Sequence, residues 1–212
     1  MNSLAEALEN QAGPLLDRAG GHPLLQALRG PQVAAQQYRR ALVSLHGYCR
    51  SLEPILLARP EWTPHELGLP PGGRVRLLEQ DLQLLGAPRG PTAPLAYLPP
   101  LTRFPEHAGG AWALARAPLD GGNAAGLLNG GLPSECHKAR SFVGWHCRHA
   151  DSRHTAALIE GLLESESDRK RTVAAARATA HGLDRWLRDA EPVPALESPT
   201  PSRPARDAGP RL

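Results

Sequence analysis

The sequence predicts a single all-α domain, and three observations support this. Apolar residues recur at three- and four-residue steps in several segments. Capping residues, Gly and Pro stand near the ends of those segments. No segment alternates apolar and polar residues convincingly, as a half-buried strand does. A length of 212 residues fits one domain with a core large enough to fold unaided. We therefore expect a helical domain over residues 1–190, followed by a disordered tail.

Composition excludes several classes of protein. The formal net charge is only +3, and no dense Lys/Arg block occurs, so nucleic-acid binding is not indicated. No apolar run approaches the ~20 residues that span a membrane. The N-terminus has neither the basic start nor the apolar core of a secretory signal. Cys49, Cys136 and Cys147 are an odd number without a CxxC pair, which favours a reducing cytoplasm over a disulfide framework.

The first half of the chain predicts four helices. Ser3 and Glu6 form a capping box that begins the first, and Gly20-Gly21 ends it. A short second helix covers 23–30, and a long third helix runs from 31 to about 59, with Pro54 kinking it or marking its last turns. The segment 74–86 is an amphipathic helix between two Pro/Gly-containing loops, 60–73 and 87–105. The expected apolar faces comprise Leu4, Leu8, Leu15, Leu16, Tyr38, Leu42, Leu45, Cys49, Leu52, Ile55, Leu56, Val75, Leu78, Leu82 and Leu85.

The second half predicts an interrupted helix followed by three more. A helix over 106–129 is expected to break near Pro118. Helices are then expected over 140–149 and 155–163, and Ser167 is expected to cap a last helix that ends at Asp189. The inward face of that helix comprises Val173, Ala176, Ala180, Leu183 and Leu187. Residues 191–212 are Pro, Ser, Ala and Arg without periodicity, which predicts a disordered tail.

The stretch 109–122, GGAWALARAPLDGG, allows two interpretations. Paired glycines disfavour a helix interior and usually mark a break, so the segment could be a helix end followed by a loop. Alternatively, the glycines keep the helix backbone bare so that a flat ligand can lie against it. Residues elsewhere in the chain favour the second interpretation.

Four stretches together resemble the bacterial heme oxygenase family, especially the biliverdin-producing type associated with bacteriophytochromes. The segment from His22-Pro23-Leu24-Leu25 to Leu52-Glu53-Pro54 resembles the family's second and third helices. The segment 74–86 is similar to its R-x-R-x-x-x-L-x-x-D-L-x-x-L-G, and 140–145, RSFVGW, to its R-F-F-x-G-Y. The segment 109–122 resembles its distal helix, G-A-L-Y-V-L-E-G-S-T-L-G-G. The resemblance spans roughly residues 8–187.

The resemblance implies a heme-binding helical fold that opens heme oxidatively to biliverdin, iron and carbon monoxide. In that family one helix supplies a His ligand to iron, and the glycine-kinked distal helix crosses the other face of the heme. The implied partners are heme or another tetrapyrrole, an electron donor, and a phytochrome. The residues that the resemblance places at the heme are Trp112, Ala117, Gly121, Gly122 and Arg140.

The chain departs from the family at its proximal position. The family's first helix reads P-L-H-x-x-L-E-x-H-P-L-L, and the iron-ligating His aligns here with Leu16. A Leu side chain cannot coordinate heme iron. In the distal helix, Ala117-Pro118 stands where the family has Gly-Ser, Arg116 replaces a Glu, and Asp120 is new. These departures predict a degenerate heme oxygenase.

Other residues offer weaker alternatives. His22 is the nearest possible replacement ligand, although capping the second helix or facing solvent is the simpler role, and His46 is expected to be a surface or hydrogen-bonded histidine. Arg140, Lys138 and Arg116 could pair with the propionates of a tetrapyrrole. A set of Cys and His residues has only one pair at a zinc-like spacing, His149 and His154. That set comprises Cys136, His137, His146, Cys147, His149 and His154.

Two hypotheses follow from the sequence. The chain is either a heme oxygenase, or a non-catalytic homologue that binds a tetrapyrrole or a protein partner on the same fold. The residue at position 16 is the feature that distinguishes them.

Overall fold

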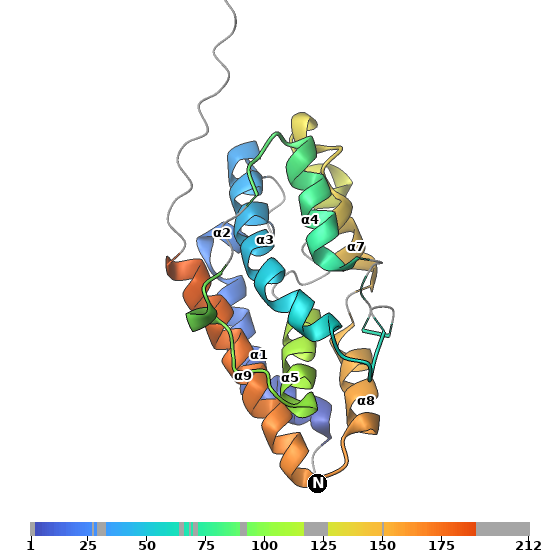
Figure 1. Ribbon diagram of the computed structural model, residues 1–212. Helices are drawn as coiled ribbons and strands as arrows, with labels where there is room; N and C mark the ends of the chain where they lie inside the picture. The colour runs from blue at the N-terminus through green and yellow to red at the C-terminus, as the bar shows by residue number, and fades with distance from the viewer. Residues whose placement is uncertain are drawn as a thin grey trace, which may run out of the picture.

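A computed structural model gives the fold (Figure 1). It describes residues 3–26, 28, 33–63, 66–67, 69, 72–89, 93–116, 127–149 and 151–189. All regular structure in these residues is helical, which confirms the all-α prediction. The α-helices are α1 (Leu4–Gly20), α2 (Pro23–Gln26), α3 (Ala35–Leu57), α4 (Gly73–Leu84), α5 (Phe104–Arg116), α7 (Ser141–His149), α8 (Ser152–Leu162) and α9 (Glu166–Asp189). Short 3-10 turns, η1 (Leu95–Tyr97) and η3 (Ser134–Cys136), and a π-type turn, η2 (Leu127–Gly131), lie between them.

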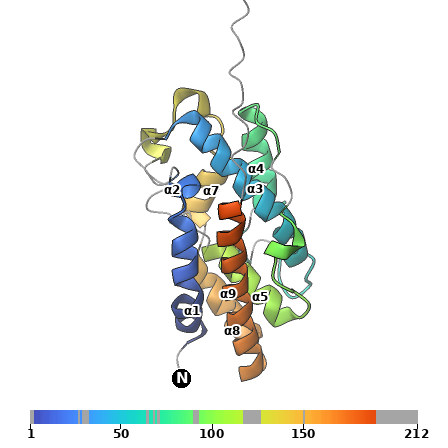
Figure 2. The same cartoon turned by 90° about the vertical axis from the view of Figure 1, so that its left-hand side faces the viewer.

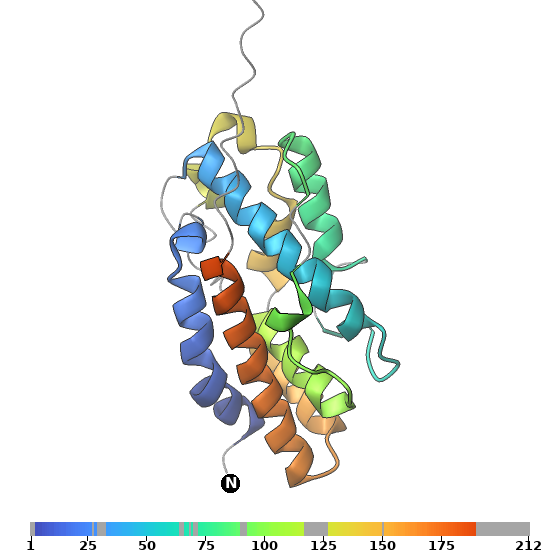
Figure 3. The same ribbon diagram turned by 60° about the vertical axis from the view of Figure 1, so that its left-hand side comes forward.

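The helices form two groups that share one core. The first group contains α1, α5, α8 and α9, and the most extensive helix contacts are those of α9 with α5 and with α1. The second group contains α3, α4 and α7, with α4 packed between the other two (Figure 1). Figures 2 and 3 show α1 and α9 side by side and running in the same direction. One buried cluster contains Tyr38, Leu42, Leu45, Leu52, Leu82, Trp112 and Leu183. Of the expected apolar faces, Leu15, Ile55 and Val75 are only partly buried.

Local signals in the sequence explain several helix ends. Ser3 and Glu6 form the expected capping box of α1, and Gly21 caps its C-terminus. Pro54 lies in the last turn of α3, which ends at Leu57. The cap of α9 differs from the prediction, because Ser165 rather than Ser167 accepts a hydrogen bond from the backbone N–H of Asp168, at 3.1 Å. Ser167 lies inside the helix, two residues beyond the capping position.

Two glycines allow α9 to approach other backbone segments. A Cβ added to Gly109 of α5 would overlap the carbonyl oxygen of Thr172 and lie 2.7 Å from the backbone nitrogen of Ala176. A Cβ added to Gly182 of α9 would overlap the carbonyl oxygen of Tyr97. The pair Gly109-Gly110 therefore lies inside α5 and serves helix packing. It does not end the helix, and the second glycine pair of the stretch, Gly121-Gly122, lies outside the described residues.

Buried aromatic side chains tie α3 to the rest of the core. The Tyr48 hydroxyl donates to the carbonyl of Thr179 at 2.7 Å, and the Trp186 indole donates to the carbonyl of Ser44 at 2.9 Å, so both join α3 to α9. The Tyr38 hydroxyl donates to the carbonyl of Ala139 at 2.6 Å, just before α7. Each polar group is satisfied in the interior, as burial of a hydroxyl or indole requires.

His46 differs from its predicted surface or hydrogen-bonded role. It is fully buried in α3, and neither ring nitrogen has a hydrogen-bond partner among the described residues. Its Nε2 lies 3.6 Å from Oε1 of Glu79 in α4, which is too long for a hydrogen bond. Burial lowers the pKa of the imidazole, Glu79 opposes that shift, and Arg50 and Arg89 reinforce it. The folded protein therefore favours neutral His46.

This burial predicts that the protein loses stability in mild acid. The unfolded chain binds a proton at His46 below about pH 6.5, whereas the folded chain resists it, so the free energy of unfolding falls as pH drops through that value. The slope from one histidine is at most about 1.4 kcal/mol per pH unit. Urea unfolding at pH 8 and pH 5.5 measures it. His46→Leu should reduce the difference, whereas His154→Gln, at an exposed position, should leave it unchanged.

Candidate functional site

The face of α1 that carries Leu16 is the position that sequence analysis placed at heme iron. Leu16 is 1% exposed and belongs to the hydrophobic core. Glu9 precedes it by seven residues and Gly13 by three, so the three lie on one side of the helix. A Cβ added to Gly13 would lie 2.9 Å from Oε2 of Glu9, so the Glu9 carboxylate lies over Gly13.

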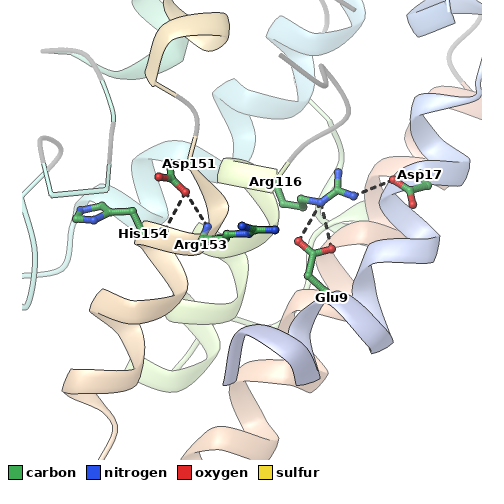
Figure 4. Close-up of polar contacts among 6 residues, drawn as sticks. All are labelled: Glu9, Asp17, Arg116, Asp151, Arg153 and His154. Carbon is green, nitrogen blue, oxygen red and sulfur yellow. Dashed lines mark hydrogen bonds and ion pairs between the residues drawn. The ribbon is translucent and has the colours of Figure 1, made fainter. Parts of the chain in front are cut away.

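An ion cluster, which we call the α1–α5 clasp, joins this face to the end of α5 (Figure 4). It consists of Glu9, Asp17 and Arg116. The Arg116 Nε donates to both carboxylate oxygens of Glu9, at 3.1 and 3.2 Å, and its Nη2 donates to Oδ1 of Asp17 at 3.0 Å. The guanidinium thus binds one carboxylate on each side of Leu16 along the helix.

Arg116 has a different role from the one considered from the sequence. It stands where the family has a Glu, and it was a candidate to meet tetrapyrrole propionates. Instead its donors bind two carboxylates of α1, and the side chain is 24% exposed. The clasp therefore joins α1 to the C-terminal end of α5.

The other residues predicted to contact heme do not surround Leu16 in the described part of the chain. Trp112 is 1% exposed and lies within the core of α5. Arg140 is exposed just before α7. Ala117, Gly121 and Gly122 lie outside the described residues, as do Pro118, Asp120 and the tail 191–212.

His22 has the capping role that the sequence offered as the simpler alternative. Its Nδ1 accepts a hydrogen bond from the backbone N–H of Leu24 at 3.3 Å, at the start of α2. Burial lowers its pKa, Asp184 opposes the shift, and Arg188 reinforces it. An imidazole that caps α2 beside the end of α9 is committed to that contact.

Glu53 and Asp81, which belong to motifs that carry the resemblance, each cap a neighbouring helix of the second group. Oε1 and Oε2 of Glu53 accept from the backbone N–H groups of Arg74 and Val75, each at 2.9 Å, at the N-terminus of α4. Oδ1 and Oδ2 of Asp81 accept from Ser141 and Phe142, at 3.0 and 2.9 Å, at the N-terminus of α7.

The two caps assign a structural role to three of the four motifs. Glu53 belongs to the L-E-P stretch, Asp81 to 74–86, and its two donors to RSFVGW. The polar residues that carry the resemblance in these motifs thus hold the helices in place. The sequence did not predict this capping role for them. A carboxylate is nevertheless a favourable partner for the N-terminus of a helix.

The Cys and His residues considered as a metal site do not form a ligand cluster in the part of the chain that the structure describes. Cys136 is buried, and burial raises the pKa of its thiol. His137 Nε2 contacts the carbonyl of Leu132 at 2.8 Å, and His154 is exposed on α8. Among the residues with described positions, no three His, Cys, Asp or Glu side chains converge as metal ligands.

Two of the cavities lined by described residues lie away from Leu16, Trp112 and Arg140. One of about 390 Å³ lies between α1 and α9, and one of about 320 Å³ lies beside Phe104 and Leu163.

The helices within the described ranges are all too short or too polar to cross a bilayer. No protein-family model, curated protein or solved structure matches the chain.

The residues at the Leu16 face do not fit an iron-bound heme. A heme sandwiched there needs an imidazole, thiolate, thioether or phenolate on α1, and the position holds an apolar side chain inside the core. It also needs α1 and α5 to be separated by the ring, whereas the clasp joins them directly.

Proposed function

We propose that the chain is a heme oxygenase-like protein without heme turnover, which acts as a non-catalytic binding module on that fold. The observation that carries the proposal is the α1–α5 clasp over buried Leu16. The helices that would hold heme in an active family member are held to each other by Arg116. The family resemblance itself rests on the motifs described above.

Charge and burial support an apo state at this face. Three charges are satisfied within the clasp, and removing Arg116 to admit a ring would leave Glu9 and Asp17 facing each other without it. Partly exposed ion pairs contribute only about 1 kcal/mol each at most, so the clasp alone cannot exclude a ligand. Loss of the axial ligand is the larger effect, because an iron–imidazole bond has no substitute in Leu.

Titration of hemin into the purified protein tests the proposal. The wild type should show no sharp Soret band of a histidine complex, and ascorbate should produce no biliverdin. Leu16→His combined with Arg116→Ala returns an imidazole and opens the clasp, and it should tighten hemin binding by about tenfold or more, or about 1.4 kcal/mol. Leu15→His, one position away on a different face of α1, is the matched control and should bind like the wild type.

Three outcomes decide among the alternatives. Conversion of heme to biliverdin by the wild type would overturn the proposal and leave the enzyme interpretation. A wild-type histidine complex that His22→Ala abolishes would show that the ligand has moved to α2. Tight hemin binding without a histidine spectrum and without turnover would make the ligand of the module a tetrapyrrole, with Arg140→Ala as the variant that tests propionate pairing.

A further inference from the structure

A second surface of α1 carries a groove that the proposed function does not use. The α1–α9 groove has a volume of about 390 Å³ and lies where the two helices run side by side (Figures 2 and 3). Its lining residues are Leu4, Ala7, Gln11, Glu166, Arg169, Lys170, Val173, Ala174 and Arg177.

The groove is separate from the clasp. Ala7 and Gln11 are each two residues from Glu9, which corresponds to about 200° of rotation around an α-helix. The α1–α9 groove and the clasp therefore lie on nearly opposite sides of α1. A ligand in the groove would leave Leu16 and Arg116 untouched.

The floor of the groove is apolar and made of small side chains. Leu4 and Val173 are buried beneath it, and Ala7 and Ala174 supply its accessible apolar surface. Small residues permit an approaching backbone to come close, because no long side chain holds it away. From Glu166 to Arg177 the α9 wall spans about 16 Å, or three helical turns.

The rim of the groove carries three cationic side chains and one carboxylate, that of Glu166. Lys170 and Arg177 are exposed, lie seven residues apart on one face of α9, and make no ion pair with any residue of known position. Arg169 differs from them, because it binds Glu160 at 2.7 Å and Glu166 at 3.7 Å. Seven residues correspond to about 10 Å along the helix, so the two cations mark a two-turn stripe.

The helix dipoles add to this positive potential. The groove is built from the N-terminal halves of α1 and α9, and both helices begin at the same end of the molecule (Figure 3). The N-terminus of an α-helix carries about half a positive charge. The aligned helix ends and the two cations on the rim favour an occupant with negative charge.

We propose that the α1–α9 groove docks an acidic amphipathic helix of a partner protein. A helix of three turns matches the length of the groove, its apolar stripe would pack on Ala7 and Ala174, and flanking Glu or Asp residues would pair with Lys170 and Arg177. Apolar anchors at helical spacing in a groove are a recurrent mode of peptide recognition. The docking proposal names a partner class for the non-catalytic module and so rests on the proposed function. Its test involves no heme, so the two proposals can fail independently.

Fluorescence anisotropy with a synthetic peptide tests this docking. The probe is a fluorescein-labelled helix with Leu at i, i+3, i+4 and i+7 and Glu on both flanks, and its partner probe replaces every Glu with Lys. The acidic probe should bind the wild type in the micromolar range, and the basic probe should bind at least tenfold more weakly. For Lys170→Glu with Arg177→Glu the preference should reverse.

The matched control is Arg18→Glu with Arg148→Glu, which makes the same change in net charge at two exposed positions outside the groove. It should keep the wild-type preference. No binding of either probe at 100 µM protein, or equal binding of the acidic probe by both double variants, would overturn the proposal. Dodecanoate is a further probe. If it binds the wild type but not Lys170→Glu with Arg177→Glu, and the acidic probe does not bind, the groove is a small-ligand site instead.

Discussion

Gly109→Ala should destabilise the protein by about 3 kcal/mol, although it adds a single methyl group to a helix. The new Cβ would overlap the carbonyl oxygen of Thr172 and press on the backbone nitrogen of Ala176, so neither contact can be relieved by a rotamer change. The helices α5 and α9 would have to move apart along the most extensive helix contact of the fold. Overpacking against backbone costs about 1–3 kcal/mol and sometimes more.

Thermal unfolding measures this effect. For a domain of this size a loss of about 3 kcal/mol lowers Tm by about 10 °C. Gly161→Ala is the matched control, because it makes the same substitution in helix α8, where an added Cβ meets nothing within 4 Å. It should raise stability by about 0.5 kcal/mol through helix propensity alone. A Gly109→Ala protein that melts within 2 °C of the wild type would show that α5 and α9 do not approach as closely as the structure indicates.

The residues that sequence reasoning placed correctly are those whose signal is local. The capping box at Ser3 and Glu6 and the last-turn position of Pro54 can be assigned from neighbouring residues, and both agree with the structure. The apolar period of α9 likewise predicts its buried face. These features depend on backbone geometry within one or two turns of helix, which a sequence carries directly.

The features that could not be predicted depend on partners far away in the chain. Arg116 lies 107 residues from Glu9, and no pattern around either residue indicates their ion pair. The contact between Gly109 and Thr172 similarly requires knowledge of which helices pack together. His46 was misplaced because a histidine among apolar residues gives the same local signal whether it is buried or exposed.

The clasp brings together two departures from the family pattern, Leu16 and Arg116. In the sequence, Leu16 and Arg116 are independent substitutions in two motifs. In the structure, Arg116 of α5 binds Glu9 and Asp17, which flank Leu16 on α1. The two departures therefore lie on one surface, and together they support the proposed absence of heme turnover.

Asp81→Ala should destabilise the protein by about 3 kcal/mol, because it removes a buried cap that joins α4 to α7. Its two oxygens accept the backbone N–H groups of Ser141 and Phe142, which lie 60 and 61 residues later in the chain. Without the carboxylate these donors at the start of α7 remain partly or fully buried and unpaired, and each such group costs about 1–3 kcal/mol. The side chain itself is fully buried, so water replaces it poorly.

Two further variants separate the contribution of the hydrogen bonds from that of the charge. Burial raises the pKa of Asp81, and the N–H groups of Phe142 and Ser141 oppose that shift. Keeping the buried carboxylate ionised therefore costs free energy. Asp81→Asn removes the charge and keeps one acceptor oxygen, and it should lose about half as much stability as Asp81→Ala in urea unfolding. Asp151→Ala is the matched control, since Asp151 caps α8 from an exposed position and its loss should cost about 1 kcal/mol. Equal losses for Asp81→Ala and Asp151→Ala would contradict the assignment of Asp81 as a buried link between helices.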